Sequence, residues 1–424
     1  MTRALLDSPA RRRRRRIGTL LLTPVGVAVA TLAALVVGAA VQEPAAPDAA
    51  ATDPGAAAIA DPVGVRIASL RAQLGTTPDN ADAWAELGAL YVQEAENAVN
   101  PAYYPKADAA LTRSLALRPG GDAVGLGGLA ALRVAQHRFV ESHDLAQRAL
   151  AIDATNATLY GTLADADIQL GLYDDAHNAV RQMLDRRPDV RSLARAAYVD
   201  ELTGEVDKAR AMLTQALGVA STPSDVAFCH DGLAELAFSG GEPAEALRQI
   251  QLGTAADADA PDLLEGQAKA EAALGQVEAA AADYQRLVQG VPLPKYLREA
   301  GEYFESIGLT ADAHQADELF ATQNTLFTAN GVQLDTDPTL FYANQGDPVQ
   351  ALRYAEAGLR ARPSAEMQDA YAWALFANGR DVESLAWAEK AASTGMRNAL
   401  FSFHQGMIEN SLGRRAAARA DLTL

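Results

Sequence analysis

Apolar and polar positions follow one another along this chain with helical spacing, in segments of about thirteen residues that often end at a glycine. LLEGQAKAEAAL precedes Gly275, for example, and VEAAAADYQRLV follows it. Glycine adopts at low cost the left-handed backbone geometry that ends a helix and reverses the chain. The pattern therefore predicts pairs of antiparallel helices joined by tight turns.

The same turn recurs every 33 to 38 residues. Hexapeptides related to GLYDDA (171–176) begin at residues 204, 241, 275, 308, 346 and 413, with GRDVES at 379 as a looser copy. A small residue, usually alanine, stands five residues after each glycine, where we expect the second helix to cross the first. Prolines are predicted to end second helices in LALRPG (115–120), LDRRPD (184–189), VQGVPL (288–293) and LRARPS (359–364).

One segment carries a known motif. WAELGALY reproduces W-x-x-L-G-x-x-Y, and the motif positions of this unit are Trp84, Leu87, Gly88, Tyr91, Ala107, Leu111, Ser114, Leu115 and Pro119. With its period near 34 residues, the chain resembles the tetratricopeptide repeat proteins of the exported or membrane-anchored bacterial type, over roughly residues 66–424. The resemblance implies an all-α fold, a right-handed superhelical solenoid of about ten helix-turn-helix repeats. A coiled coil is excluded because no heptad continues across the glycines.

The repeat array is expected to occupy residues 63–424. Within it, residues 62–80 predict a lone leading helix, and residues 323–340 disturb the phase and predict a kink or a longer loop. The last unit stops partway through its second helix.

The residues ahead of the array indicate a targeting element and a tether. Residues 1–16 are a basic N-region with arginine at every position from 11 to 16, and residues 17–41 are uncharged and largely apolar. Arginines before an apolar run stay in the cytoplasm, so residues 17–41 are predicted to be a transmembrane anchor or a signal peptide. Residues 42–62, rich in alanine, proline and aspartate, are predicted to be a flexible linker. The array would then lie outside the cytoplasm, attached to a bacterial inner membrane or exported.

The net charge of the chain indicates which class of partner it could bind. The formal net charge is −18, and because the first 41 residues hold seven arginines and one aspartate, the remainder carries −24. So acidic a body repels nucleic acid and would attract basic ligands. The single cysteine, Cys229, excludes an internal disulfide.

The resemblance implies a concave face lined by first helices and suited to polypeptide segments. The positions expected to face this groove are Asp165, Glu201, Asp231, Glu235, Glu265, Glu302 and Glu305, with the basic exceptions Lys269 and Arg298, followed by the apolar Trp373, Phe376, Phe403 and Met407. One interpretation makes the acids solvated helix faces and the aromatics core. The other makes them an acidic groove that leads to an aromatic pocket and holds a basic or mixed peptide. The lysine, arginine and asparagine clamp that some relatives use for C-terminal carboxylates has no counterpart here.

Signals for chemistry are weak. The six histidines are scattered outside any H-E-x-x-H motif, and no G-x-S-x-G motif is present. Adjacent Cys229 and His230 would diverge by about 100° on a helix. The aspartates near residue 259 lack the glycine and distal glutamate of a calcium loop, and His404 with Met407 fits core packing. We therefore expect no catalytic residue, metal or cofactor.

These features predict a non-enzymatic scaffold for protein–protein interaction in the bacterial cell envelope. A periplasmic or secreted chaperone or assembly factor remains an alternative, and an enzyme with a site between repeats is a remote one.

Overall fold

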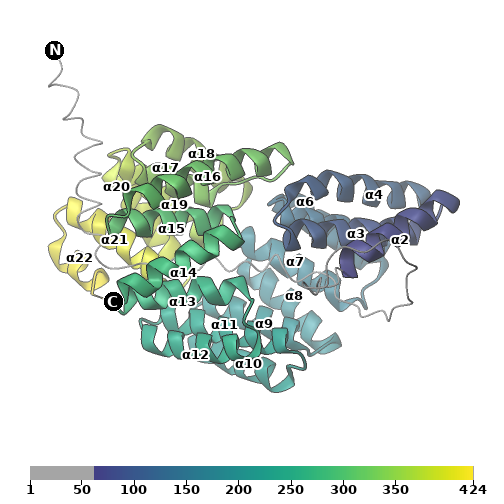
Figure 1. Ribbon diagram of the computed structural model, residues 1–424, viewed down its shortest axis with the longest axis horizontal. Helices are drawn as coiled ribbons and strands as arrows, with labels where there is room; N and C mark the ends of the chain where they lie inside the picture. The colour runs from purple at the N-terminus through teal and green to yellow at the C-terminus, as the bar shows by residue number, and fades with distance from the viewer. Residues whose placement is uncertain (1–61, 424) are drawn as a thin grey trace, which may run out of the picture.

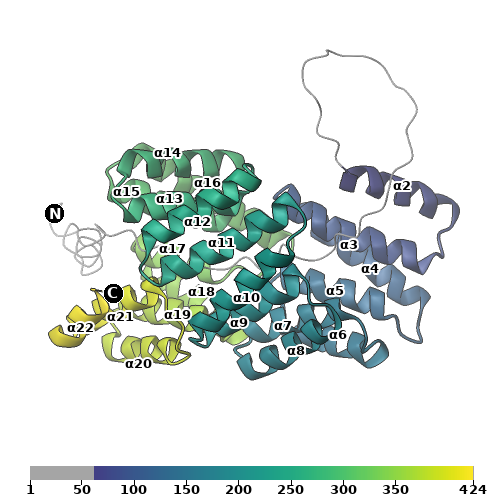
Figure 2. The same ribbon diagram turned by 90° about the horizontal axis from the view of Figure 1, so that it is seen from below.

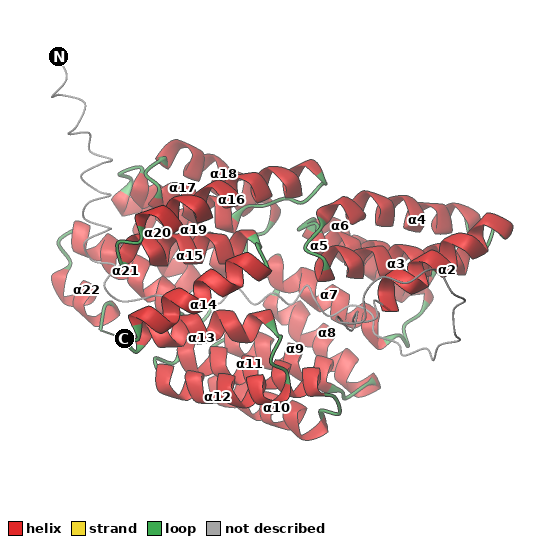
Figure 3. Cartoon of the chain, viewed as in Figure 1, coloured by secondary structure: helices red, strands yellow, loops and turns green. Residues whose placement is uncertain are grey.

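The computed structural model describes residues 62–423, which fold into 21 α-helices and one short 3₁₀ helix, η3, joined by loops (Figures 1 and 3). Their bounds are α2 Pro62–Thr76, α3 Ala81–Asn97, η3 Pro101–Tyr103, α4 Tyr104–Leu117, α5 Ala123–Ala135, α6 Phe139–Ile152, α7 Ala157–Gln169, α8 Tyr173–Arg186, α9 Val190–Leu202, α10 Val206–Val219, α11 Pro223–Ser239, α12 Pro243–Ala256, α13 Pro261–Ala273, α14 Val277–Gly290, α15 Pro294–Ser306, α16 Thr310–Ala329, α17 Thr336–Asn344, α18 Pro348–Ala361, α19 Ala365–Ala377, α20 Asp381–Ala392, α21 Ala399–Ser411 and α22 Arg415–Asp421.

The helices form a lone leading helix, α2, and ten helix pairs, from repeat 1 (α3 and α4) to repeat 10 (α21 and α22). The all-α repeat fold is thus confirmed. All eight predicted turn glycines have positive φ, between 70° and 83°. Two further turns hold Val99 (φ 48°) and His137 (φ 57°), which the sequence pattern did not reveal because neither is a glycine.

Hydrogen bonds show that the glycine and non-glycine turns have the same geometry. After Gly171, the Leu172 N–H donates to the carbonyl oxygen of Asp167 at 2.8 Å, and after His137, the Arg138 N–H donates to that of Arg133 at 2.8 Å. This backward bond caps the last turn of the first helix. Repeats 1 and 2 therefore belong to the same phased series as the rest.

The residue five places after each turn packs where the two helices cross. Ala176, Ala209 and Ala351 are fully buried at 0% exposure. Ser142 and Ser384 take the same position, and each donates its hydroxyl hydrogen to a first-helix carbonyl, at 2.9 and 2.7 Å. A small side chain at this point lets the two backbones approach closely.

Prolines end four second helices as predicted. Helices α4, α8, α14 and α18 each stop two residues before a proline, at Leu117, Arg186, Gly290 and Ala361. The residue before a proline is driven out of helical geometry, and the proline lacks an N–H for the next helical bond.

Repeats 7 and 8 differ from the others in helix length. Helix α16 has 20 residues and includes residues 323–329, a loop follows at 330–335, and α17 has only 9 residues. The extra length of α16 brings Phe327 into a hydrophobic cluster with Val92, Ala95 and Tyr104 of repeat 1. The irregular segment therefore joins two parts of the chain that are far apart in sequence.

The array winds far enough for late repeats to touch early ones (Figure 2). The Gln333 N–H donates to the Gln136 carbonyl oxygen at 2.9 Å, and the Ala365 N–H donates to the Tyr173 hydroxyl oxygen at 2.9 Å. The Tyr198 hydroxyl donates to Glu366 Oε1 at 3.1 Å. Repeats 2–4 thus lie against repeats 8–10, and the solenoid is closed upon itself, which the predicted concave groove did not specify.

Within residues 62–423, no helix combines the length and apolar character needed to cross a membrane. The predicted N-region (1–16), the predicted anchor or signal peptide (17–41) and nearly all of the predicted linker (42–62) lie outside the described residues.

Candidate partner-binding site

First helices form the inner surface of the array. Tyr198 on α9 and Glu366 on α19 belong to the first helices of repeats 4 and 9, and they meet across the winding. A column of side chains on these helices lies six residues before each turn glycine. Its members are Asp165, Tyr198, Glu235, Lys269, Glu302, Leu340, Trp373 and Met407.

An ion-pair network connects the inner helices α11, α13 and α15. Lys269 Nζ lies 3.0 Å from Glu235 Oε1 and 3.5 Å from Glu265 Oε1. Lys295 Nζ reaches the other oxygen of Glu265 at 2.8 Å. Glu265 and Lys269 are almost completely buried, at 2% and 1% exposure. Because a buried charge without a partner is costly, the Lys269–Glu235 and Lys295–Glu265 pairs, which join neighbouring repeats, hold those repeats in register.

The network continues through Arg298 into α17 and α19. Arg298 contacts Glu299 at 3.1 Å, Glu302 at 3.3 Å and Asp337 at 3.0 Å. Asn344 Nδ2 donates to Glu302 Oε1 at 2.8 Å, and Trp373 Nε1 donates to Asn344 Oδ1 at 2.7 Å.

At its C-terminal end the network meets a buried histidine. The His404 ring stacks on the Trp373 ring with centroids 4.1 Å apart, and its Nδ1 lies 2.7 Å from Asp369 Oδ2. His404 and Asp369 are each 1% exposed. A continuous chain of polar and stacking contacts thus joins the first helices of repeats 5–10.

Carboxylates outnumber cations along this surface. Burial first, and then the nearby Glu235 and Glu366, raise the pKa of Glu201 to about 8. Burial and the Glu265 charge likewise raise the pKa of Glu299 to about 8. Burial, followed by the charge of Asp262, raises the pKa of Asp231 well above its usual range. Several of these groups therefore retain protons near neutral pH, and a cation brought to the surface would displace them.

The predicted site residues fall into two groups. Five acids are partly or fully exposed and can be reached from solvent: Glu201, Asp231, Glu235, Glu302 and Glu305. The others are buried: Asp165, which forms a two-point pair with Arg195 at 2.8 Å, Glu265, Trp373, Phe376, Phe403 and Met407.

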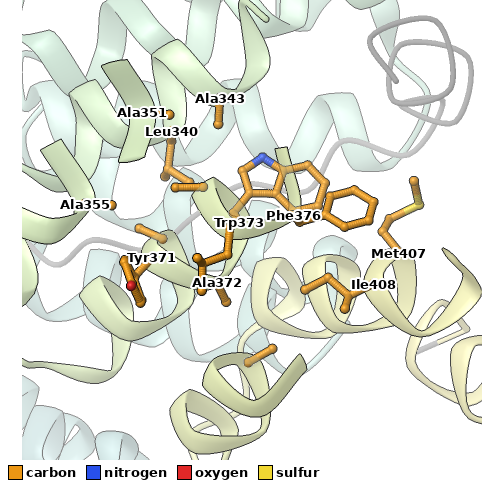
Figure 4. Close-up of a cluster of buried hydrophobic side chains, with 14 of the residues drawn as sticks. Leu340, Ala343, Ala351, Ala355, Tyr371, Ala372, Trp373, Phe376, Met407 and Ile408 are labelled. Atoms are coloured by element: carbon orange, nitrogen blue, oxygen red, sulfur yellow. The ribbon is translucent and has the colours of Figure 1, made fainter. Parts of the chain in front are cut away.

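The predicted aromatic pocket is part of the core. Figure 4 shows the Trp373 and Phe376 rings side by side, with Met407 close to Phe376. Their exposures are 1%, 5% and 5%, and Phe403, in the same cluster, is 7% exposed. These side chains leave almost no surface for a partner, because repeats 8–10 pack around them.

Sequence reasoning missed several residues of the inner surface. Lys295 and Glu366 each stand thirteen residues before a turn glycine, so a second column could have revealed them. Tyr198 lies in the first column but is neither acidic nor basic. Its contact with Glu366 depends on the winding, which repeat phase does not specify.

Other candidates for chemistry have packing roles. Cys229 is fully buried, and burial raises the pKa of its thiol to about 11. His230 Nδ1 lies 2.8 Å from the side-chain oxygen of Gln249. Among the described residues, no group of three or more histidine, cysteine, aspartate or glutamate side chains is placed to hold a metal ion.

Comparison with solved structures finds distant similarities. PilF of Pseudomonas aeruginosa is 17% identical over 51% of this chain and 94% of its own, with a TM-score of 0.37. A tetratricopeptide repeat protein of Thermus thermophilus is 25% identical over 40% of this chain and 91% of its own, with a TM-score of 0.37. PilW, a type IV pilus biogenesis factor, is 14% identical over 49% of this chain and 97% of its own, with a TM-score of 0.40. These similarities are too distant to indicate a function, and no curated protein sequence matches the chain.

A direct family match comes from the sequence of the early repeats. Residues 133–198, from the end of α5 into α9, match the tetratricopeptide repeat family. Helix pairs of the same phase continue on both sides of this segment, from α3 to α22. Residues 133–198 are thus identified as tetratricopeptide repeats, and the helix pairs on either side continue the same all-α repeat architecture.

Proposed function

We propose that this protein is a non-enzymatic scaffold that holds a basic polypeptide segment against the acidic inner surface of its array. The observation that carries the proposal is the excess of carboxylates on first helices. Among the described residues, no lysine or arginine lies within ion-pair distance of Glu201 or Asp231, and both are partly exposed. Lysine or arginine side chains of a partner would supply the missing charge.

This surface favours charge recognition over apolar recognition. Its aromatic side chains are buried, so the accessible groups are mainly carboxylates such as Glu235 and Glu302. Binding through exposed charges weakens as salt screens them. The partner is therefore expected to bind reversibly, with an affinity that falls as ionic strength rises.

We further propose that the scaffold works outside the cytoplasm of a bacterial cell. The support is the order of the N-terminal sequence, with six arginines at 11–16, an apolar run at 17–41 and an Ala/Pro/Asp-rich stretch at 42–62. A protease protection assay on intact spheroplasts tests this placement. Digestion of the array from outside the cell would support it, and full protection would contradict it.

Peptide binding tests the acidic surface. The full-length chain is titrated against a fluorescein-labelled lysine- and arginine-rich peptide, and the double variant Glu201→Gln/Asp231→Asn is compared with it by anisotropy. Loss of two carboxyl groups that ionise when a cation binds should weaken binding by about tenfold, equivalent to about 1.4 kcal/mol. The control is Glu278→Gln, which removes an exposed acid on the second helix α14. Equal affinities in the three proteins would reject the proposed surface.

A further inference from the structure

Four contacts join repeats that are far apart in the sequence, and together we name them the latch. They are the Gln136–Gln333 backbone bond, the Tyr173–Ala365 bond, the Tyr198–Glu366 bond and the close approach of Gly204 to Gly395. The first residue of each lies in repeats 2–4. The second residues lie between the end of repeat 7 and the start of repeat 10.

Two turn glycines, Gly204 and Gly171, also allow another repeat to approach closely at the latch. A Cβ atom on Gly204 would lie 2.7 Å from the Gly395 carbonyl oxygen, and one on Gly171 would lie 3.0 Å from that of Pro363. At the turn glycines Gly275 and Gly308, a Cβ atom would meet nothing within 4 Å. All four have similar positive φ values, between 70° and 83°. Only the first two also need to be glycine because another repeat lies against them.

Apolar packing adds to the attraction across the latch. One buried cluster contains Ile168 and Leu202 of repeats 3 and 4 together with Ala365, Met396 and Phe401 of the later repeats. These side chains would be partly uncovered if the two sets of repeats separated.

Charge opposes this attraction. Glu201 on α9 lies near enough to Glu366 on α19 and Glu235 on α11 for their charges to raise its pKa, so carboxylates from both sides of the latch repel one another when Glu201 is ionised. Glu366 is 3% exposed, and its Oε2 atom accepts no hydrogen bond. Arg362 forms a long ion pair with that oxygen, at 3.9 Å, and a closer one with Asp335, at 3.2 Å. Hydrogen bonds and apolar packing therefore hold the latch closed, while repulsion between carboxylates acts to open it.

We propose that the latch opens and closes reversibly as a unit, so that the array alternates between the closed winding and an open superhelix. Repeats 5 and 6, which make none of the four contacts, act as the flexible connection between the two sides. Consecutive repeats stay packed throughout, because their shared helix interfaces are continuous along the chain. The change is a small rotation repeated at each interface, which is how solenoids bend.

Distance measurements between the two sides test the latch. Spin labels are attached to cysteines at Asp207 on α10 and Val382 on α20, both exposed, in the full-length chain. Cys229 is fully buried and does not compete for the label. Gly204→Ala should move a measurable part of the distance distribution to longer values. Gly308→Ala introduces the same methyl group at a similar φ, of 83°, and should leave the distribution unchanged.

A milder variant covers the case in which Gly204→Ala fails to fold. Tyr173→Phe keeps the aromatic ring and removes only the oxygen that accepts the Ala365 N–H. A shift to longer distances in either variant, without a shift in Gly308→Ala, supports the latch. Unchanged distances in both variants, or an equal shift in Gly308→Ala, would overturn it.

Discussion

Glu201 shows how one residue can link stability to binding. Its carboxyl lies partly buried on α9, near Glu235 and Glu366, and burial together with these charges raises its pKa to about 8. The native state therefore holds this proton more tightly than the unfolded chain does. The stability that the proton contributes is fully present below about pH 4.5 and is lost as the pH rises through about 8.

Replacing this residue with its neutral isostere should remove that pH dependence. At about pH 9, Glu201→Gln should raise the free energy of unfolding by roughly 1 to 3 kcal/mol, because the ionised carboxylate is no longer held near two others. At about pH 4.5 the gain should vanish. Denaturant unfolding followed by circular dichroism measures both values, with Glu278→Gln as the exposed control. A gain that does not depend on pH would show that the carboxylate is not crowded.

At the scale of the element, the helix pair is specified by a few positions. Glycine ends the first helix, a small residue five places later allows the helices to cross, and proline ends the second helix. These signals predicted eight of the ten turns. They could not predict the turns at Val99 and His137, because a non-glycine residue with positive φ is recognisable only from its backbone. The length of α16 was also beyond them, since its last turns are stabilised by contacts with repeat 1.

Enlarging the crossing residue should separate a helix pair. Ala351 is 0% exposed between α17 and α18, so Ala351→Leu should lower the free energy of unfolding by about 1 to 3 kcal/mol through overpacking. Ala357→Leu is the control, because it places the same side chain on the exposed face of α18. Thermal unfolding compares the two variants. Similar melting temperatures would mean that the crossing point tolerates bulk.

At the scale of the whole molecule, closure brings acidic side chains of distant repeats close together, as it does with Glu366 and Glu201. The sequence located most of these acids, since first-helix phase decides which positions face inward. It could not show that Glu366 would meet Glu201 and Tyr198, because that depends on small rotations summed over about five repeat interfaces. For the same reason the sequence could not decide between a groove position and the core for the aromatic residues, which lie in the core.

If the proposed function holds, a basic ligand should favour the closed winding. A lysine or arginine placed between Glu201, Glu235 and Glu366 would turn the repulsion across the latch into attraction. Adding the lysine- and arginine-rich peptide to the Asp207/Val382 spin-labelled chain should narrow the distance distribution toward its short component. Glu366→Gln should weaken this response, and a glutamate-rich peptide should produce none. Broadening toward longer distances would mean that the partner enters the open form.

The hydrogen bond between Tyr198 and Glu366 should change how the molecule unfolds under a pulling force. Linear repeat arrays commonly unravel from a free terminus, one unit after another, because each unit touches only its neighbours. Here the ninth unit is fastened to the fourth, so peeling the C-terminal end also removes support from the middle of the chain. A molecule held at both ends and pulled should first resist and then unfold in one large step, not one repeat at a time.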